Sequence, residues 1–195
     1  MIPFNFKGRA RKISKIWYKT FGVTLLFLLI EYAYFPNYKQ TIHYDVMLTA
    51  SKIMSQAMKE VKNYRDALGI AIDRVNDPNQ TGIIGEYFTE ITTTTGNLGA
   101  KRTTTNPNFA ALMVHLLFEA GVKNGDTIAI GSSGSFPALI LATLSAAKVM
   151  DLKPIIISSL GASMWGANNT QMTWLDIYYH LYNKRIFPYK IHAAS

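Results

Sequence analysis

The longest apolar stretch of the chain lies near its start, between Ile16 and Phe35. Lys19 and Glu31 stand near its two ends, and the centre from Phe21 to Ile30 carries no charge. Twenty residues at about 1.5 Å each just span a hydrocarbon core of roughly 30 Å. The pattern therefore predicts a transmembrane helix over residues 16–35.

Two other readings of this stretch stay open. A cleavable signal peptide has the same basic and apolar parts, but it needs small residues at the cleavage site, and Tyr32 and Tyr34 are bulky. A buried helix of a soluble protein would leave the neighbouring cations unexplained. Trp17, Tyr18 and the two tyrosines lie at the edges of the stretch, as interfacial aromatics do, which favours the anchor.

The charge of the chain is concentrated at its N-terminal end. The formal net charge is +8, and no acidic residue precedes Glu31. The basic residues of this segment are Lys7, Arg9, Arg11, Lys12, Lys15 and Lys19. Cations on one side of an apolar span place that side in the cytoplasm, so residues 1–15 are predicted to be cytoplasmic and the domain extracytoplasmic. The same distribution argues against a nucleic-acid-binding face.

Residues 36–70 are predicted to form an amphipathic helix or stalk. Pro36 and Asn37 break the apolar stretch, and a helical pattern runs from His43 to Leu68. Its apolar positions recur at steps of three and four: Met47, Ala50, Met54, Ala57, Val61, Tyr64 and Leu68. Such a stripe either packs on the rest of the domain or forms the seam of a homo-oligomer.

Residues 71–195 have the pattern of an α/β domain with a mostly parallel sheet and a βαβ unit. The segment 92–108, rich in Thr, Gly and Asn, is expected to be a polar loop. The elements expected after it are a helix from Asn106 to Gly121, a strand over 127–130, a loop over 131–135, a helix over 136–150, a strand over 155–157 buried on both faces, a helix over 174–184 and a strand over 189–194. So few strands suggest a domain that is truncated or completed by a partner.

The loop from Gly131 to Ser135 carries the strongest chemical signal. It lies between a strand and the start of a helix, where unpaired N–H groups and the helix dipole favour an anion, and Ser132, Ser133 and Ser135 add hydroxyl donors around Gly134. Its position at the carboxyl end of a parallel strand is where open α/β sheets bind ligands. A tight turn that needs only small residues explains the same pattern.

Catalysis is a third reading of this loop. The segment approaches the nucleophile elbow G-x-S-x-G, with Ser133 as the nucleophile and Ser135 in place of the last glycine. A hydrolase would also need a histidine and an acidic residue, for which the candidates are His180 or His192 and Asp151 or Asp176. The sequence thus leaves a structural turn, an anion-binding loop and a catalytic Ser133 as three readings of this loop.

Two further segments complete the candidate site. Lys101 and Arg102 lie among hydroxyl and amide donors and suit an anionic ligand. Trp165 lies in the small-residue segment 158–169, which the topology of the sheet should bring beside the serine loop. The chain has no cysteine, and its histidines have no metal-ligand spacing, so no metal site and no cofactor is predicted.

Four blocks of the sequence resemble one known family. They are TTTTGNLGAKRTTTNPNFAA from Thr92, GSSGSFPAL from Gly131, SSLGASMWGAN from Ser158 and TWLD from Thr173. In this order they are similar to the poly-gamma-glutamate system protein family, membrane-anchored bacterial proteins associated with poly-gamma-glutamate production. The resemblance implies a place in the cell envelope beside the ligase and export proteins of the polymer, and it supplies no catalytic residue.

The residues and the resemblance lead to one expectation, that of a single-pass protein of the bacterial cell membrane, an accessory protein that binds an anionic glutamyl polymer or its precursor. The alternatives are a serine-dependent hydrolase or transferase of gamma-glutamyl bonds and a scaffold subunit that self-associates through its amphipathic helix.

Overall fold

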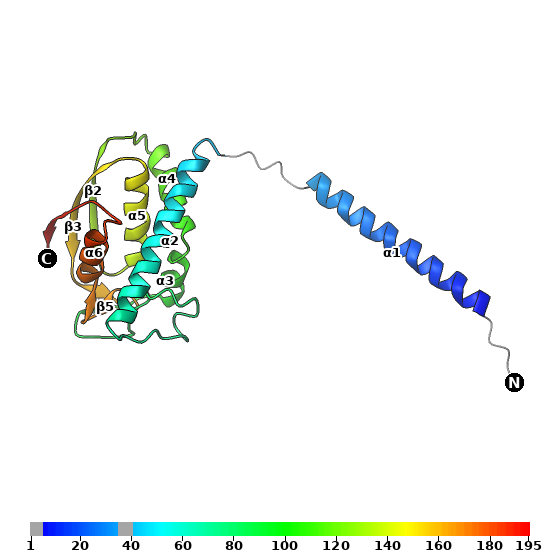
Figure 1. Ribbon diagram of the computed structural model, residues 1–195, viewed down its shortest axis with the longest axis horizontal. Coiled ribbons are helices and arrows are strands. Elements are labelled where there is room, and N and C mark those ends of the chain that lie inside the picture. The colour runs from blue at the N-terminus through cyan, green and yellow to red at the C-terminus, as the bar shows by residue number, and fades with distance from the viewer. Residues whose placement is uncertain (1–5, 35–40) are drawn as a thin grey trace. The chain divides into compact units, whose positions relative to one another are not determined.

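The computed structural model describes residues 6–34 and 41–195, which fall into two compact units, Met1–Thr41 and Ile42–Ser195. Among these residues, the first unit contains a single long helix, and the second contains the remaining helices and the strands (Figure 1). The break predicted at Pro36 and Asn37 and the first residues of the basic segment 1–15 lie outside the described residues.

The first unit contains helix α1, Phe6–Tyr34. The predicted helical conformation is confirmed, and the side chains of residues 17–33 are exposed. Across the part of the chain that the structure describes, however, no helix is both long enough and apolar enough to cross a membrane. Lys19, Glu31 and the two threonines of this stretch lower the mean hydropathy of α1.

The second unit is a mixed α/β domain, as the sequence predicts. Its helices are α2 (Tyr44–Ala67), α3 (Leu98–Thr104), α4 (Asn108–Glu119), α5 (Pro137–Val149) and α6 (Trp174–Asn183). Its strands are β1 (Thr92–Thr94), β2 (Thr127–Ser133), β3 (Lys153–Ser159), β4 (Ala162–Ser163), β5 (Asn168–Asn169), β6 (Met172–Thr173) and β7 (Ile191–Ala194).

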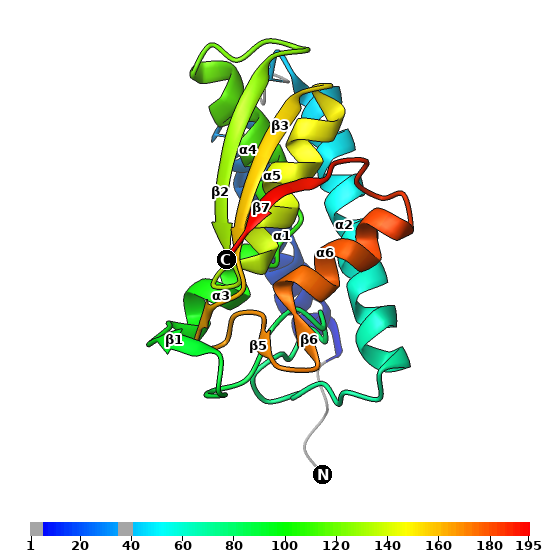
Figure 2. The same ribbon diagram turned by 90° about the vertical axis from the view of Figure 1, so that its left-hand side faces the viewer.

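The main sheet has three parallel strands in the order β2-β3-β7. Strands β2 and β3 are joined through α5, which confirms the predicted βαβ unit. Two small pairs complete the strands of the described chain, β1 with β4 in parallel and β5 with β6 in antiparallel orientation. Helices α2, α4 and α5 lie behind the main sheet in Figure 2.

Helix α5 forms the centre of the core because nearly all of its side chains are buried. Helices α2 and α4 both pack against it and against each other. The predicted stripe of α2 supplies Ala50, Met54, Ala57 and Val61 to this core, each of them almost inaccessible to solvent. These positions are thus used within the chain, and α2 belongs to the domain.

Three expectations about the local structure are wrong. Strand β2 continues to Ser133 because Gly131, Ser132 and Ser133 pair with residues 157–159 of β3, so the loop begins only at Gly134. The polar segment 92–108 contains strand β1 and helix α3. Strand β3 is buried on one face: Ile156 is 1 % exposed, whereas Ile155 and Ile157 are 46 % and 57 % exposed.

Candidate functional site

The predicted serines lie at the carboxyl end of β2, beside the end of β3. Ser132 Oγ is 3.0 Å from Ser158 Oγ on the neighbouring strand. Ser133 Oγ accepts a hydrogen bond of 3.4 Å from the backbone N–H of Ser135. The chain then turns into α5, where Pro137 occupies the first turn and loses no helical hydrogen bond by lacking an N–H. The serine hydroxyls therefore gather at the N-terminus of a helix.

These serines border an open hollow of about 210 Å³. We call it the serine hollow; Ser132, Ser133, Ser135, Phe136 and Thr143 are among the residues that line it. Hydroxyl groups line one side of the hollow, and the Phe136 ring adds an apolar wall. A hollow of this composition suits a small anionic group attached to an aliphatic chain.

Lys101 lies directly against the serine segment. It is 2 % exposed, and its Nζ donates to the backbone carbonyl of Ser135 and, at 2.7 Å, to Ser163 Oγ. The same Nζ lies 3.9 Å from the centre of the Phe136 ring. Helix α3 sets this position, and its N-cap Asn97 accepts a hydrogen bond from the N–H of Ala100 at 2.9 Å.

The charge of Lys101 is not neutralised by a carboxylate. Among the described residues no acidic side chain forms an ion pair with it. Burial lowers the pKa of Lys101 to about 8, because removal from water disfavours the ammonium form. At pH 7 the lysine is still mostly protonated, and its positive charge lies behind the Ser135 carbonyl.

The small-residue segment 158–169 meets the serine segment, as its place after β3 predicts. Ser163 N–H donates to Ser135 Oγ at 3.0 Å, and the N–H of Ala167 donates to the Gly134 carbonyl at 2.7 Å. The approach is so close at Gly166 that an added Cβ would lie 2.5 Å from the carbonyl oxygen of Gly134. This glycine is therefore required by packing between two loops.

Trp165 and Arg102 do not join the serine hollow. Trp165 has a φ of 63° and its ring lies 5.6 Å from that of Tyr87, in a tilted arrangement. Arg102 Nε donates to the carbonyl of Asn76 at 2.7 Å, and its Nη2 donates to that of Val75 at 2.6 Å. Of the two predicted cations, only Lys101 reaches the serines.

Both histidines and Asp176, which the sequence suggests for a catalytic triad, are engaged elsewhere. His180 Nε2 is 2.8 Å from Glu60 Oε1, and His192 Nδ1 accepts the N–H of Ile156 at 3.0 Å. Asp176 caps helix α6 together with Thr173. Within the described chain, no group of three or more histidine and acidic side chains is placed to hold a metal ion.

Sequence reasoning missed a second buried cation, Arg65 of α2. Its Nη1 donates to the carbonyls of Gly82 and Ile84, and its Nη2 to that of Ala71, at 2.8 to 3.3 Å. Burial lowers the pKa of its guanidinium, and Glu86 at 3.9 Å opposes that shift. Nothing in the pattern of α2 separates this arginine from an exposed one.

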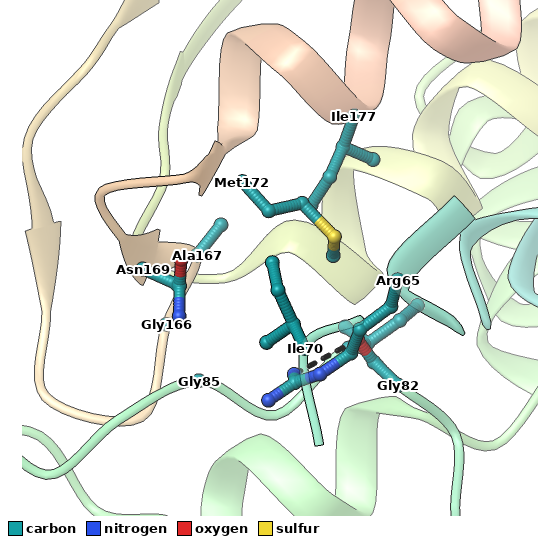
Figure 3. A pocket seen from close by; sticks show the side chains of 10 residues that line it. Arg65, Ile70, Gly82, Gly85, Gly166, Ala167, Asn169, Met172 and Ile177 are labelled. Atoms are coloured by element: carbon teal, nitrogen blue, oxygen red, sulfur yellow. Dashed lines mark hydrogen bonds between the residues drawn. The ribbon is translucent and has the colours of Figure 1, made fainter. Parts of the chain in front are cut away.

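The pocket beside Arg65 is shown in Figure 3, where Ile70, Met172 and Ile177 also point into it. Its volume of about 10 Å³ holds no more than one water molecule. Arg65 Nε has no protein partner, and such a water would satisfy it. This pocket is thus a structural feature of the loop 70–86, and the serine hollow is the better site for a ligand.

Comparison of the chain with protein-family models, with curated proteins and with solved structures gives no match.

Proposed function

We propose that the chain is an accessory protein of the bacterial cell envelope that binds carboxylate groups of a gamma-glutamyl polymer in the serine hollow. The observation that carries this proposal is the buried ammonium of Lys101, which has no acidic partner among the described residues and contacts the Ser135 carbonyl. An uncompensated charge in a poorly hydrated place acts strongly on a nearby anion. The hydroxyls of Ser133 and Ser135 and the start of α5 supply hydrogen-bond donors.

The polymer itself is suggested by the resemblance of the sequence to poly-gamma-glutamate system proteins. Its repeating carboxylates match a hollow that has room for one small anionic group and an aliphatic segment. Ligase and export proteins in the membrane are the partners that this role implies. Arg102 is left out of the proposed site because the backbone carbonyls of Val75 and Asn76 hold its guanidinium.

Attachment to the membrane is part of the same proposal. The side chains of Phe21, Leu26, Phe27 and Leu28 in α1 are all more than half exposed, and cations precede them in the sequence. An exposed apolar helix next to a basic segment favours attachment to a lipid surface. Sedimentation of bacterial membranes in neutral buffer of low salt should carry the chain into the pellet; recovery of the intact chain in the soluble fraction without detergent would refute the attachment.

Binding is tested by titrating the full chain, held in phosphatidylcholine nanodiscs, with purified poly-gamma-glutamate at low and high salt. Ser133→Ala together with Ser135→Ala should weaken binding about a hundredfold, since each lost hydrogen bond to a charged group is worth about 1.5 kcal/mol or more. Ser55→Ala is the matched control because Ser55 is exposed on α2. Salt-insensitive binding, or equal binding by the double variant, would argue against the site.

A serine-dependent hydrolase or transferase of gamma-glutamyl bonds is the second candidate, and one contact favours it. Lys101 Nζ lies 2.7 Å from Ser163 Oγ, so the neutral amine is placed to accept the proton of that hydroxyl. This pair makes Ser163 a better nucleophile than Ser133. Ser163 is 5 % exposed, however, and a substrate carbonyl reaches it only if the loop around it moves.

A fluorophosphonate probe separates the two candidates. Labelling that disappears in Ser163→Ala and persists in Ser133→Ala would establish the enzyme. The binding proposal predicts that the wild-type chain is not labelled.

A further inference from the structure

One face of the main sheet is uncovered. Helices α2, α4 and α5 lie behind the three strands in Figure 2, and no helix of residues 42–195 crosses in front of them. The exposed residues of this face alternate with the buried ones along β2 and β3. We call it the open sheet face; it consists of Ala129, Gly131, Ile155, Ile157 and Ala193.

Side chains of different size make the open sheet face uneven. Ile155 and Ile157 form a ridge along the central strand, and they are 46 % and 57 % exposed. The register places Ala129 beside Ile155, and it places Gly131 and Ala193 on the two sides of Ile157. A ridge of two branched side chains thus stands beside a shallow row of small residues on β2, and Ala193 lies on its other side. Large side chains of another element can fill the space next to the ridge.

Parallel sheets are covered by helices on both faces in nearly all proteins, because βαβ connections place helices there. Half-exposed isoleucines in the middle of such a sheet favour a covering element. The strands β2 and β3 each have seven residues, or roughly 23 Å at 3.3 Å per residue. A helix of about 15 residues has the same length.

The charges at one end of this face decide between a second copy and a different partner. An open hollow of about 460 Å³ lies there, and its lining includes Lys153, Lys190 and His192 but no acidic residue. Asp126, at the start of β2, accepts a hydrogen bond from the N–H of Lys123. Two copies that meet through this face with their strands parallel would bring lysines against lysines, whereas an acidic segment would be attracted.

We propose that the open sheet face docks an amphipathic helix of a partner protein. The helix presents large apolar side chains to the space beside Ile155 and Ile157, and it carries acidic residues at the end that meets Lys153 and Lys190. This inference does not depend on ligand binding in the serine hollow, which lies toward the carboxyl end of β2 and borders the open sheet face at Gly131.

Two synthetic helical peptides of about 15 residues test the proposal. They share one leucine-rich face and differ only in four terminal positions, which are glutamate in one peptide and lysine in the other. Fluorescence anisotropy with the full chain in phosphatidylcholine nanodiscs should show binding of the glutamate peptide, and at least about tenfold weaker binding of the lysine peptide. Binding of neither peptide, or equal binding of both, overturns the proposal.

Ile157→Thr keeps a β-branched residue in the strand and removes the apolar tip of the ridge. It should weaken binding of the glutamate peptide about tenfold. Val75→Thr, a change at a residue that is 80 % exposed, should leave this binding unchanged. Lys153→Glu changes only an exposed charge and should shift the preference toward the lysine peptide. Unchanged binding by Ile157→Thr overturns the proposal. So does a wild-type dimer in analytical ultracentrifugation that Ile157→Thr dissociates, because a second copy would then cover the face.

Discussion

Replacement of Lys101 by methionine keeps most of the aliphatic volume of the side chain and removes its charge, which contacts the serine segment. In the folded chain the pKa of this lysine is about 8, whereas its value in an unfolded chain is near 10.5. Between these values the unfolded chain binds more protons than the folded one. The free energy of unfolding of the wild-type chain must therefore rise with pH across this window.

The two pKa values give the size of the effect. Holding the ammonium in the fold costs about 3 kcal/mol at pH 7 and about 1 kcal/mol at pH 10, so the free energy of unfolding should rise by roughly 2 kcal/mol between these conditions. Other groups titrate over the same range, but the wild type and Lys101→Met both contain them, so their effects cancel in the difference between the two. The difference in stability between the wild type and Lys101→Met should thus move by about 2 kcal/mol in favour of the wild type as the pH rises.

Urea unfolding of the full chain in mild detergent micelles, followed by tryptophan fluorescence at pH 7, 8, 9 and 10, measures this difference. Trp174 is 1 % exposed and reports on the core. Lys101→Arg is the matched control. Arginine stays charged from pH 7 to 10, so this variant should also lack the rise of the free energy of unfolding with pH that comes from Lys101. Parallel pH profiles for the wild type and Lys101→Met would refute a buried lysine with a lowered pKa.

The remaining predictions concern packing and charge elsewhere in the domain. Gly166→Ala should lower the free energy of unfolding by about 2 kcal/mol, since the added Cβ would meet backbone at 2.5 Å. Gly131→Ala, whose added Cβ has no atom within 4 Å, should change it by less than about 0.5 kcal/mol. Urea unfolding midpoints measure both variants. Arg65→Met should lower stability by about 3 kcal/mol, seen as a lower Tm, because three buried carbonyls lose their donor. The hydrogen bond from His180 is the main reason that the pKa of Glu60 lies below 4.5. Glu60→Gln should therefore lower the free energy of unfolding by less than about 1 kcal/mol above pH 4.5. This difference from the wild type should vanish when unfolding is measured at acid pH below the lowered pKa of Glu60.

The helices of the domain could be predicted because their apolar positions repeat every three to four residues. Helices α2 and α6 begin and end within a residue or two of the predicted limits. Helix α3 was missed because it is only seven residues long and lies in a segment rich in threonine. Threonine is a weaker helix former than alanine or leucine, and the cap at Asn97 and the packing of Lys101 into the core both stabilise this short helix.

The run of three isoleucines in β3 illustrates another limit. A continuous apolar run is compatible with burial on one face or on both, because each residue is apolar whichever way it points. Only the arrangement of the helices reveals that Ile155 and Ile157 face outward. The open sheet face could thus not be read from the sequence.

The candidate site was predicted in part. Parallel topology correctly brings the segment after β3 beside the serine segment. The two neighbouring cations were expected together, yet successive residues on a helix point about 100° apart, so Lys101 turns inward while Arg102 turns toward Val75. The position of a buried lysine depends on contacts distant in sequence, and composition does not indicate them.

The central claim is that the positive charge of Lys101 helps to hold carboxylates in the serine hollow. Its most direct test is the affinity of the full chain in phosphatidylcholine nanodiscs for poly-gamma-glutamate at pH 7 and at pH 9.5, where the polymer stays ionised and Lys101 loses its proton. We expect binding to weaken about tenfold at the higher pH in the wild type and to change little in Lys101→Arg. Equal affinity of the wild type at both pH values would contradict the account.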